Sequence, residues 1–569
     1  MGVPADGYGQ TTTTPHKRRM RITRVLSALA ITLTAACASV PRGPGSGRYD
    51  VLITNARIVD GTGNPWYRGS VATVGDRIAY VGPSIPGLSA RRVIDARDQV
   101  VAPGFIDMLG HSEFAILRGP HAVSKISQGI TSEITGEVHS AWPNVALGEQ
   151  PDPRFPWRSL GQYFDYIQNK GIAINLGTYV GTSSVREAVM GEVTRHPTDV
   201  EMKQMGALID SAMRDGAMGV GTGLIYLPST FFSTEELIAL TKYATPYKGG
   251  YAAHIRSEGN GLLDAIRETI RIAAEAGTWA EIRHIKSRSP EQMMQAIALI
   301  DSARRAGIDI TADQYPYIAS GTGLSAMLNT WVQEGGDDSL VVRLKDPAVR
   351  ARLKAELGAD SAQGVRTAAR TMVNEVGVDS LKIYEGKLLT DIAKMRGQDA
   401  YDAAFDILIG DRGRTSAIYF SFNEDALRYA MKQPWVSVGQ DAGAVSPDST
   451  GKWRERGHPR GFGTFPRILG LYVRQDSVIP LEFAIRKMTS LAAQRVGLNE
   501  RGLLKPGMYA DITVFDPTTI IDRATFEEPS QLATGVSYVL VNGVPVVDGG
   551  QVTAALPGRA LRGPGYRGK

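Results

Sequence analysis

Six ionisable residues stand where short apolar runs of this sequence end. They are His111, Glu137, His254, His284, Asp313 and Asp441. The chain of 569 residues contains only eight histidines, and three of them belong to this set. Imidazole nitrogens and carboxylate oxygens are ligands of zinc, and a catalytic zinc site leaves one position to water. The set therefore predicts a catalytic metal site.

The spacing of these residues suggests how they could meet. His254 and His284 are thirty positions apart, about the length of one βα unit, so they would end neighbouring strands and point into the same mouth. Glu137 would supply a third ligand and leave Asp441 free as a general base. The alternatives are hydrogen-bonded structural histidines, an ion pair at the rim for Glu137, and a capping or loop-bracing carboxylate at Asp313.

Eight apolar runs could position these residues, and a helical stretch generally follows each run. The runs cover residues 105–109, 131–136, 172–177, 217–221, 251–253, 281–283, 308–312 and 435–440. Buried parallel strands with crossover helices give this rhythm. Eight such units predict an α/β fold, a TIM-like (β/α)8 barrel over about residues 101–504, with its chemistry at the carboxyl ends of the strands.

The interval between Asp313 and Asp441 is far longer than one crossover requires. We expect an insertion at about residues 320–410, before the eighth strand and near the mouth of the barrel. Within it, residues 346–358 begin with Asp-Pro and end with Gly, which is typical of a helix.

Both ends of the chain have a different, strand-rich texture. The apolar alternation covers residues 49–59, 70–74, 77–81 and 92–95, and it returns at 510–515 and 536–543. Gly and Asn turns separate these segments. We expect one small β-sandwich built from residues 48–100 and 505–569; two unrelated β appendages are the alternative.

The N-terminus has the features of an export signal. A basic cluster at residues 17–24 precedes an apolar run at 25–36, which is too short to span a bilayer, so residues 1–37 predict a secretory signal peptide in which Met20 could be the true start. The run ends in Leu-Thr-Ala-Ala-Cys37, which resembles a bacterial lipobox with Thr34 in place of the usual leucine. We expect a lipid at Cys37, a tether at 38–47 and a place in the bacterial cell envelope; an ordinary secreted protein is the alternative.

Composition excludes several classes of protein. Cys37 is the only cysteine, so internal disulfides and cysteine-rich metal sites are excluded. The net charge is +5, but residues 1–37 hold five basic residues and one acidic residue. The remaining chain is nearly neutral, which argues against binding to nucleic acid.

From residue 50 to residue 565 the sequence resembles the N-acyl-D-amino-acid deacylases (D-aminoacylases) of the amidohydrolase superfamily. The shared motifs, in chain order, are VAPGFID (101–107), QGIT (128–131), GLIYLP (223–228), AHIRSE (253–258), RHIK (283–286), DQYPY (313–317), HPRGFGTFPR (458–467) and KMTS (487–490). The ordered set is far more specific than any one of these fragments.

The resemblance implies a zinc-dependent hydrolase that cleaves the linear amide of small N-acylated amino acids. The matching positions imply that His254 and His284 hold the tightly bound zinc and that Asp441 is the general base. Lys286 and Arg460 are expected to hold the substrate carboxylate. The family also has the two-domain build and the insertion inferred above.

Two departures from the family pattern concern the metal ligands. Leu109 stands where relatives carry the first histidine of His-x-His, which speaks against a second, weaker metal site at His111. Val138 stands at the position of a cysteine ligand, so Glu137 would take over, with His139 as the alternative. A shift of one residue reverses the side-chain direction on a strand, so Glu137 qualifies only where the strand has ended or bulges.

Three further points are left open by the sequence. Tyr226 and Tyr315 either line the substrate pocket or have structural roles. A hydrolase of cyclic amides or dipeptides from the same superfamily is one alternative function, although such enzymes usually keep His-x-His and two metals. A non-catalytic, surface-anchored binding protein is the other.

Overall fold

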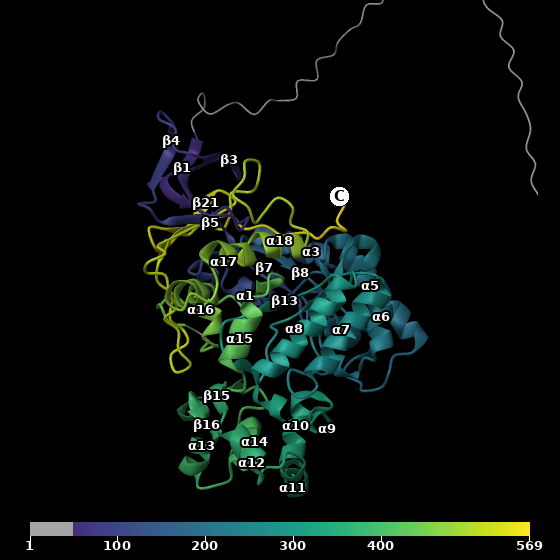
Figure 1. Cartoon of the computed structure of the whole chain (residues 1–569). Coiled ribbons are helices and arrows are strands. Elements are labelled where there is room, and N and C mark those ends of the chain that lie inside the picture. Colours follow the sequence, from purple (N-terminus) through teal and green to yellow (C-terminus); the bar gives the residue numbers. More distant parts are fainter. Residues whose placement is uncertain (1–48, 454, 569) are drawn as a thin grey trace, which may run out of the picture. The chain divides into compact units, whose positions relative to one another are not determined.

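A set of parallel strands forms the centre of the protein, between a nine-stranded sheet and an inserted helical subdomain (Figure 1). The computed structural model describes residues 49–453 and 455–568. The expected signal peptide, the lipid site Cys37 and the tether lie outside these residues. Among the described residues, no helix combines the length and apolarity that a membrane crossing requires.

Nine parallel strands make up the central set, and each of the eight expected runs overlaps at least one of them. They are β6 (Phe105–Asp107), β7 (Ile130–Thr135), β8 (Asn175–Thr178), β9 (Val180–Gly181), β10 (Gly219–Gly223), β11 (Gly250–His254), β12 (Ala280–Ile282), β13 (Ile310–Gln314) and β18 (Val436–Val438). Tyr179 alone separates β8 from β9, so these two are halves of one interrupted strand. Most of their residues are buried, as expected of strands covered on both faces.

The first and last of these strands lie next to each other. The amide of Met108 donates to the carbonyl of Val438 at 3.1 Å, and the amide of Asp441 donates to the carbonyl of Leu109 at 2.7 Å. The other strands pair in the order β6-β7-β8 and β9-β10-β11-β12-β13-β18. The carboxyl ends of all these parallel strands therefore face the same side of the molecule.

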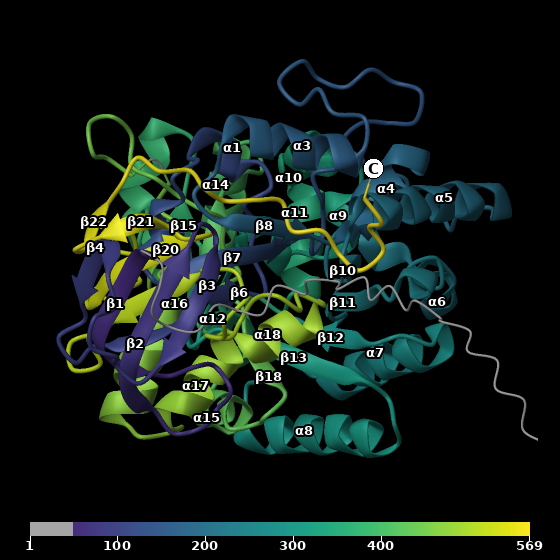
Figure 2. The ribbon, with the colours of Figure 1, turned by 90° about the horizontal axis from the view of Figure 1, so that it is seen from above.

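Helices follow the strands and cover them (Figure 2). They are α1 (Ala115–Arg118), α2 (Val123–Ile126), α3 (Leu160–Lys170), α4 (Thr182–Met190), α5 (Asp199–Asp215), α6 (Thr234–Thr241), α7 (Leu262–Ala276), α8 (Pro290–Arg305), α15 (Glu424–Met431), α16 (Arg460–Arg467), α17 (Leu481–Met488) and α18 (Ser490–Arg495). The ends of α5 illustrate the local code. Thr198 and Glu201 form a capping box at its start, and Gly216 ends it in a left-handed conformation, where glycine carries no Cβ penalty.

The insertion between β13 and β18 has a hydrophobic core of its own. It consists of β14 (Ser320–Gly323), α9 (Thr330–Gln333), α10 (Gly336–Leu344), α11 (Pro347–Glu356), α12 (Ala362–Ala368), β15 (Thr371–Glu375), β16 (Lys387–Leu388), α13 (Leu389–Arg396), α14 (Ala400–Gly410) and β17 (Ser416–Tyr419). The expected helix at 346–358 is α11, whose first turn Asp346 caps. Because β17 pairs with β14 and β15, the insertion extends to about residue 419 rather than 410.

The remaining sheet combines strands from both ends of the chain, which appear purple and yellow side by side in Figure 2. It contains β1 (Tyr49–Ile58), β2 (Tyr67–Val74), β3 (Arg77–Gly82), β4 (Ala90–Asp95), β5 (Val100–Pro103), β19 (Ile512–Phe515), β20 (Val536–Val541), β21 (Val544–Asp548) and β22 (Gln551–Val552). The antiparallel pairing of β5 with β19 joins the two halves.

Two expected domain limits are displaced in the structure. β5 belongs to this sheet through its pairing with β19 and β1, so the sheet includes residues up to Pro103 and does not stop at residue 100. The last segment leaves the sheet and runs along β8, where Leu176 donates to the carbonyl of Arg559 and accepts from the amide of Leu561. Main-chain pairing, which side-chain patterns do not encode, causes both differences.

Candidate active site

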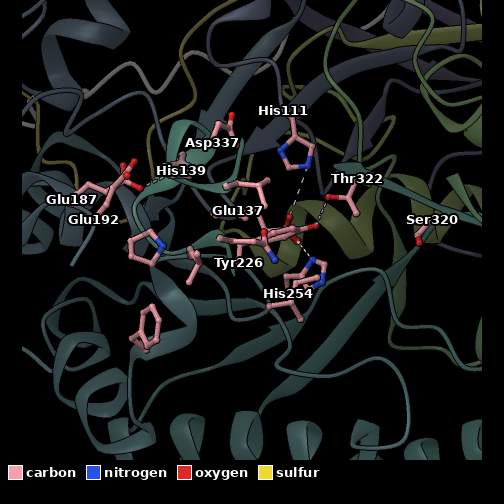
Figure 3. Close-up of a pocket in the computed structure, with 18 of the residues that line it drawn as sticks. His111, Glu137, His139, Glu187, Glu192, Tyr226, His254, Ser320, Thr322 and Asp337 are labelled. Carbon is pink, nitrogen blue, oxygen red and sulfur yellow. Dashed lines mark hydrogen bonds and ion pairs between the residues drawn. The ribbon is translucent and has the colours of Figure 1, made fainter. Parts of the chain in front are cut away.

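The carboxyl ends of the parallel strands open into a cavity of about 650 Å³. Residues of the barrel strands and of the insertion line it, including Gly335, Gly336 and Leu340 of the insertion. Figure 3 shows His111, Glu137, Tyr226 and His254 gathered at its centre, while His139, Glu187 and Glu192 lie together to one side. The cavity is therefore where the ionisable residues singled out in the sequence can meet.

Glu137, His254 and His284 converge on one point in the cavity. Nδ1 of His254 and Nε2 of His284 lie 3.0 Å apart. Oε1 of Glu137 lies 3.3 Å from that His284 nitrogen and 3.8 Å from that His254 nitrogen. All three side chains are buried, and their ligand atoms lie within 4.8 Å of one another.

Local backbone geometry turns two of these side chains into the cavity. β7 ends at Thr135, and Gly136 follows with φ +89°, in a space where a Cβ would lie 2.3 Å from the carbonyl oxygen of Tyr179. The strand has thus ended before Glu137. The alternation of side chains along a strand therefore does not apply to Glu137, and this was the condition for its role as a ligand. His284 has φ +36°, and its amide donates to Oδ1 of Asp313 at 2.7 Å. Such non-glycine conformations cluster at functional sites.

The alternative ligand His139 points elsewhere. Its Nε2 lies 2.9 Å from Oε1 of Glu187, and about half of the side chain is exposed. His139 belongs to no metal-competent group among the residues that the structure describes. The geometry therefore favours Glu137 over His139.

The donor set fits a zinc ion. Two imidazole nitrogens and one carboxylate oxygen are the protein ligands of several catalytic zinc sites. Burial lowers the pKa of His254 to about 4, which keeps its imidazole neutral and able to bind metal. Oε1 of Glu137 is buried without a hydrogen-bond donor among the described residues. The other nitrogen of His284, Nδ1, lies 2.9 Å from Glu258, and a carboxylate in that position orients a histidine ligand.

Asp441 lies at the edge of this group. Its φ is +59°, its Oδ1 lies 3.0 Å from Nε2 of His111, and its Oδ2 lies 2.8 Å from Arg460 and 4.0 Å from Nε2 of His284. Burial would raise the pKa of the Asp441 carboxyl, but Arg460, His284 and His111 hold it well below its usual range. Asp441 is therefore an ionised carboxylate that can accept a proton.

A second metal-competent group shares two of these residues. His111, Glu137 and Asp441 offer ligand atoms within 4.8 Å of one another. His111 is partly exposed, and Leu109, at the position of the missing histidine, is buried. This group thus offers three metal-ligand atoms although Leu109 cannot contribute one. One of the three comes from Asp441, the expected general base.

The expected carboxylate-binding residues lie beside the metal group. Nζ of Lys286 lies 2.9 Å from Glu258 and donates to the Tyr315 hydroxyl at 3.1 Å. Arg460 pairs with Asp441, and its guanidinium carbon lies 4.9 Å from the centre of the Tyr315 ring. Lys286 and Arg460 thus flank one tyrosine and both face the cavity.

Tyr226 lies next to His254. Its ring is 5.1 Å from that of His254 in an edge-on arrangement, and its hydroxyl donates to Thr322 of β14 at 3.1 Å. Tyr226 lines the cavity, whereas Tyr315 is almost fully buried behind Lys286. Tyr226 therefore links the barrel to the insertion across the cavity.

Two groups around the site had no role in the sequence interpretation. Glu258 contacts both His284 and Lys286. It is the last residue of the AHIRSE motif, and its position shortly after His254 is the sequence feature that could have identified it. Fully buried Lys125 lies 2.7 Å from Asp107 and 3.4 Å from Glu133. It also donates to the carbonyl of Ala442 at 2.7 Å, which braces the backbone next to Asp441.

Comparison with known proteins identifies the family to which the chain belongs. The sequence pattern of the family described as Amidohydrolase family matches residues 92–547. The chain is 32% identical to the D-aminoacylase of Alcaligenes xylosoxydans xylosoxydans, over 90% of this chain and 97% of that protein. It is 31% identical to the N-acyl-D-glutamate deacylase of the same organism, with the same coverage.

A solved structure has the same fold. The N-acyl-D-glutamate deacylase of Bordetella bronchiseptica, crystallised with zinc and a phosphonate inhibitor that mimics the tetrahedral intermediate, superimposes with a TM-score of 0.76. It is 31% identical in sequence, over 91% of this chain and all of that chain. Its fold is a TIM barrel with an additional domain. This chain belongs to the amidohydrolase family, among the N-acyl-D-amino-acid deacylases.

Proposed function

We propose that this protein is a zinc-dependent hydrolase that cleaves the amide of N-acyl-D-amino acids to a carboxylate and a free amino acid. The observation that carries the proposal is the convergence of Glu137, His254 and His284 on one point, with the ionised Asp441 at its edge. The relatives named above act on N-acyl-D-amino acids by their names.

Each residue would have a distinct role in the reaction. Zinc held by Glu137, His254 and His284 would lower the pKa of a water molecule toward ~7 and polarise the amide carbonyl. Asp441 would accept a proton from the attacking water as its oxygen adds to the amide carbon, and would return the proton to the amine nitrogen as the C–N bond breaks. Lys286 holds the substrate carboxylate through a charge-assisted hydrogen bond. Arg460 would release Asp441 and bind the substrate carboxylate through two parallel hydrogen bonds.

We further infer the finer architecture and location of the protein. Residues from about 104 to 504 would form a closed (β/α)8 barrel with its insertion, which the hydrogen bonds between the ends of β6 and β18 support. The chain ends would form a β-sandwich, which the pairing of β5 with β19 supports. The residues at 1–37 would direct the protein to the cell envelope, with a lipid at Cys37.

Amine release from paired N-acetyl-D- and N-acetyl-L-amino acids tests the proposed function. We expect release from at least one D-amino acid derivative, at a higher rate than from its L enantiomer. Dihydrouracil serves as the cyclic-amide alternative, and its preferential hydrolysis would replace the proposal. If the zinc-loaded protein released amine from none of the acylated amino acids and did not open the ring of dihydrouracil, a binding role would remain.

Replacement of Lys286 by alanine should mainly lower kcat/KM for substrates that carry a free carboxylate. A hydrogen bond to a charged group contributes about 1.5–3 kcal/mol, so kcat/KM for N-acetyl-D-leucine should fall about tenfold or more. The fall should be much smaller for N-acetyl-D-leucinamide. Equal losses of kcat/KM on both substrates would contradict the role of Lys286 in binding the carboxylate. The control is Lys432→Ala, which changes an exposed lysine.

A neighbouring chamber supports a narrower proposal, that acidic side chains are preferred. This chamber of about 710 Å³ shares Ile225, Glu258, Ser320 and Thr322 with the catalytic cavity. It is also lined by Arg288, Arg366 and Arg370. None of these three guanidinium groups forms an ion pair with a carboxylate within the described residues. Glu258, the acidic residue in the lining of the chamber, is already paired with Lys286.

The arrangement favours a substrate with a second carboxylate. Unpaired guanidinium groups attract carboxylates and can bind them bidentately. Phe422 lines the chamber and lies 5.3 Å from Nζ of Lys286, so the chamber adjoins the place expected for the amino-acid half of the substrate. An N-acylated D-glutamate would reach it with its side chain, as the name of one relative also indicates.

The double variant Arg366→Ala/Arg370→Ala tests this preference. We expect kcat/KM for N-acetyl-D-glutamate to fall about tenfold, because two charged contacts are lost. N-acetyl-D-glutamine has the same shape without the charge, so its kcat/KM should change little. A parallel fall on both substrates would contradict the preference, and Arg305→Ala, on the exposed face of α8, is the control.

A further inference from the structure

A second cavity lies at the other end of the parallel strands. Its volume is about 610 Å³, and Trp279, Asp309 and Trp435, which line it, directly precede β12, β13 and β18. These are the amino ends of the strands, whereas the catalytic groups follow the carboxyl ends. Helix α18 also borders this cavity, and Figure 1 shows α18 on the side of the barrel away from the insertion.

The lining of this second cavity is strongly cationic. Lys248, Arg304, Arg486 and Arg495 face it, against the single carboxylate of Asp309. Asp309 is paired with Arg495 at 2.6 Å. Three positive charges therefore remain uncompensated within the lining, and a concave surface of one sign attracts ions of the other sign.

Two buried polar atoms at the floor lack partners. The side chain of Arg495 is only 10% exposed, and its Nε has no hydrogen-bond acceptor among the described residues. Oγ1 of Thr311 is also buried without a partner in this part of the chain. An unsatisfied buried group costs about 1–3 kcal/mol, so an anionic oxygen that accepts from both groups would be stabilised here.

The acidic group beneath the floor does not cancel this charge. Glu281 accepts a hydrogen bond from Ser437, which lines the cavity, at 3.4 Å. Its carboxylate lies 3.8 Å from the fully buried Arg283. Arg283 also pairs with Asp313 at 2.9 Å, so one carboxylate charge beneath the floor is not compensated by this cation. Lys248, Arg304 and Arg486 outnumber it, and the surroundings of the cavity stay positively charged.

The walls are flat and apolar. The indole rings of Trp279 and Trp435 line the cavity together with Pro434, Leu491 and Val496. The guanidinium carbon of Arg495 lies 5.0 Å from the centre of the Trp279 ring, so charge and aromatic surface lie next to each other. Arg304 likewise lies 5.9 Å from the centre of the Trp435 ring. An inorganic anion would use these charges but not the apolar surface next to them.

We propose that this second cavity binds a small organic carboxylate with a flat apolar body. The carboxylate lies against Arg495 and the Thr311 hydroxyl, and the apolar body lies against Trp279 and Trp435. The proposal does not depend on the deacylase function, because none of these residues faces the catalytic cavity.

Isothermal titration of the purified chain with phenylacetate tests the proposal. Phenylacetamide keeps the apolar body without the charge, and inorganic phosphate carries negative charge without the apolar body, so these two compounds are the matched probes. We expect saturable binding of phenylacetate, and at least about tenfold weaker binding of the other two. Arg495→Met should weaken phenylacetate about tenfold, and Thr311→Val should weaken it severalfold.

A carboxylate could also enter the catalytic cavity through Lys286 and Arg460, so the double variant Lys286→Ala/Arg460→Ala is the positional control. If this variant still binds phenylacetate, the ligand lies in the second cavity. If this variant no longer binds phenylacetate, the proposal is overturned. Absence of saturable binding up to about 10 mM would also overturn it. Phosphate binding as tight as phenylacetate would overturn the assignment of an apolar body. If Arg495→Met does not fold, Thr311→Val and Lys248→Ala give the same comparison.

Discussion

Replacement of His284 by alanine should abolish deacylation. The variant loses the nitrogen that lies 3.0 Å from His254 and 3.3 Å from Glu137, so two ligands remain where a catalytic zinc site uses three. Metal assistance contributes several kcal/mol to such reactions, and each 1.4 kcal/mol is a tenfold change in rate. We therefore expect kcat/KM to fall at least about a thousandfold, together with the zinc content of the purified protein.

The effect must be separated from damage to the fold. His196 is an exposed histidine paired with Glu236, so His196→Ala should retain both activity and zinc. Glu137→Gln keeps the shape of the ligand and removes its charge, and it should lose zinc without a large change in thermal stability. A His284→Ala variant that kept zinc and activity would show that the three residues do not hold the catalytic metal.

The variant Asp441→Asn should lose activity while it retains zinc. The amide keeps the size of the carboxylate but cannot accept a proton from water. General-base catalysis contributes about 10²- to 10⁴-fold, so kcat should fall by that factor while KM changes less. Zinc content and kcat, measured on the same sample, check this result.

The second metal-competent group makes the zinc count informative. If Asp441 served only as a ligand beside His111 and Glu137, its replacement would remove metal and leave most of the rate. Activity within about threefold of the unchanged protein would therefore contradict its role as base. His111→Ala is the matched variant, because it removes a contact of Asp441 and keeps the carboxylate.

The positions of the candidate catalytic residues could be predicted because parallel strands impose a common edge. His254 and His284 follow neighbouring strands, β11 and β12, whose residues pair in register, and Asp441 follows the last strand. Glu137 was predicted only on the condition that its strand had ended, and β7 ends at Thr135. The period of the apolar runs was thus enough for residues at the strand ends.

The orientation of side chains beyond the strand ends could not be predicted. His284 and Asp441 adopt positive φ values. Asp and His are enriched in this region, but only a small share of them adopt it, so the residue type alone does not predict the conformation. The pairing of Arg460 with Asp441 joins positions that are near in sequence but come from a loop and a helix. The buried contact of Lys125 with Asp107 and Glu133 depends on how α2 packs, and an apolar pattern carries no information about it.

The most direct test of the central claim is the anomalous scattering of a zinc-loaded crystal at the zinc absorption edge. The account predicts a strong peak at bonding distance, about 2.0–2.2 Å, from His254, His284 and Glu137, with Asp441 beside it. A peak bound by other residues, or no peak between these three side chains in an active preparation, would contradict the account.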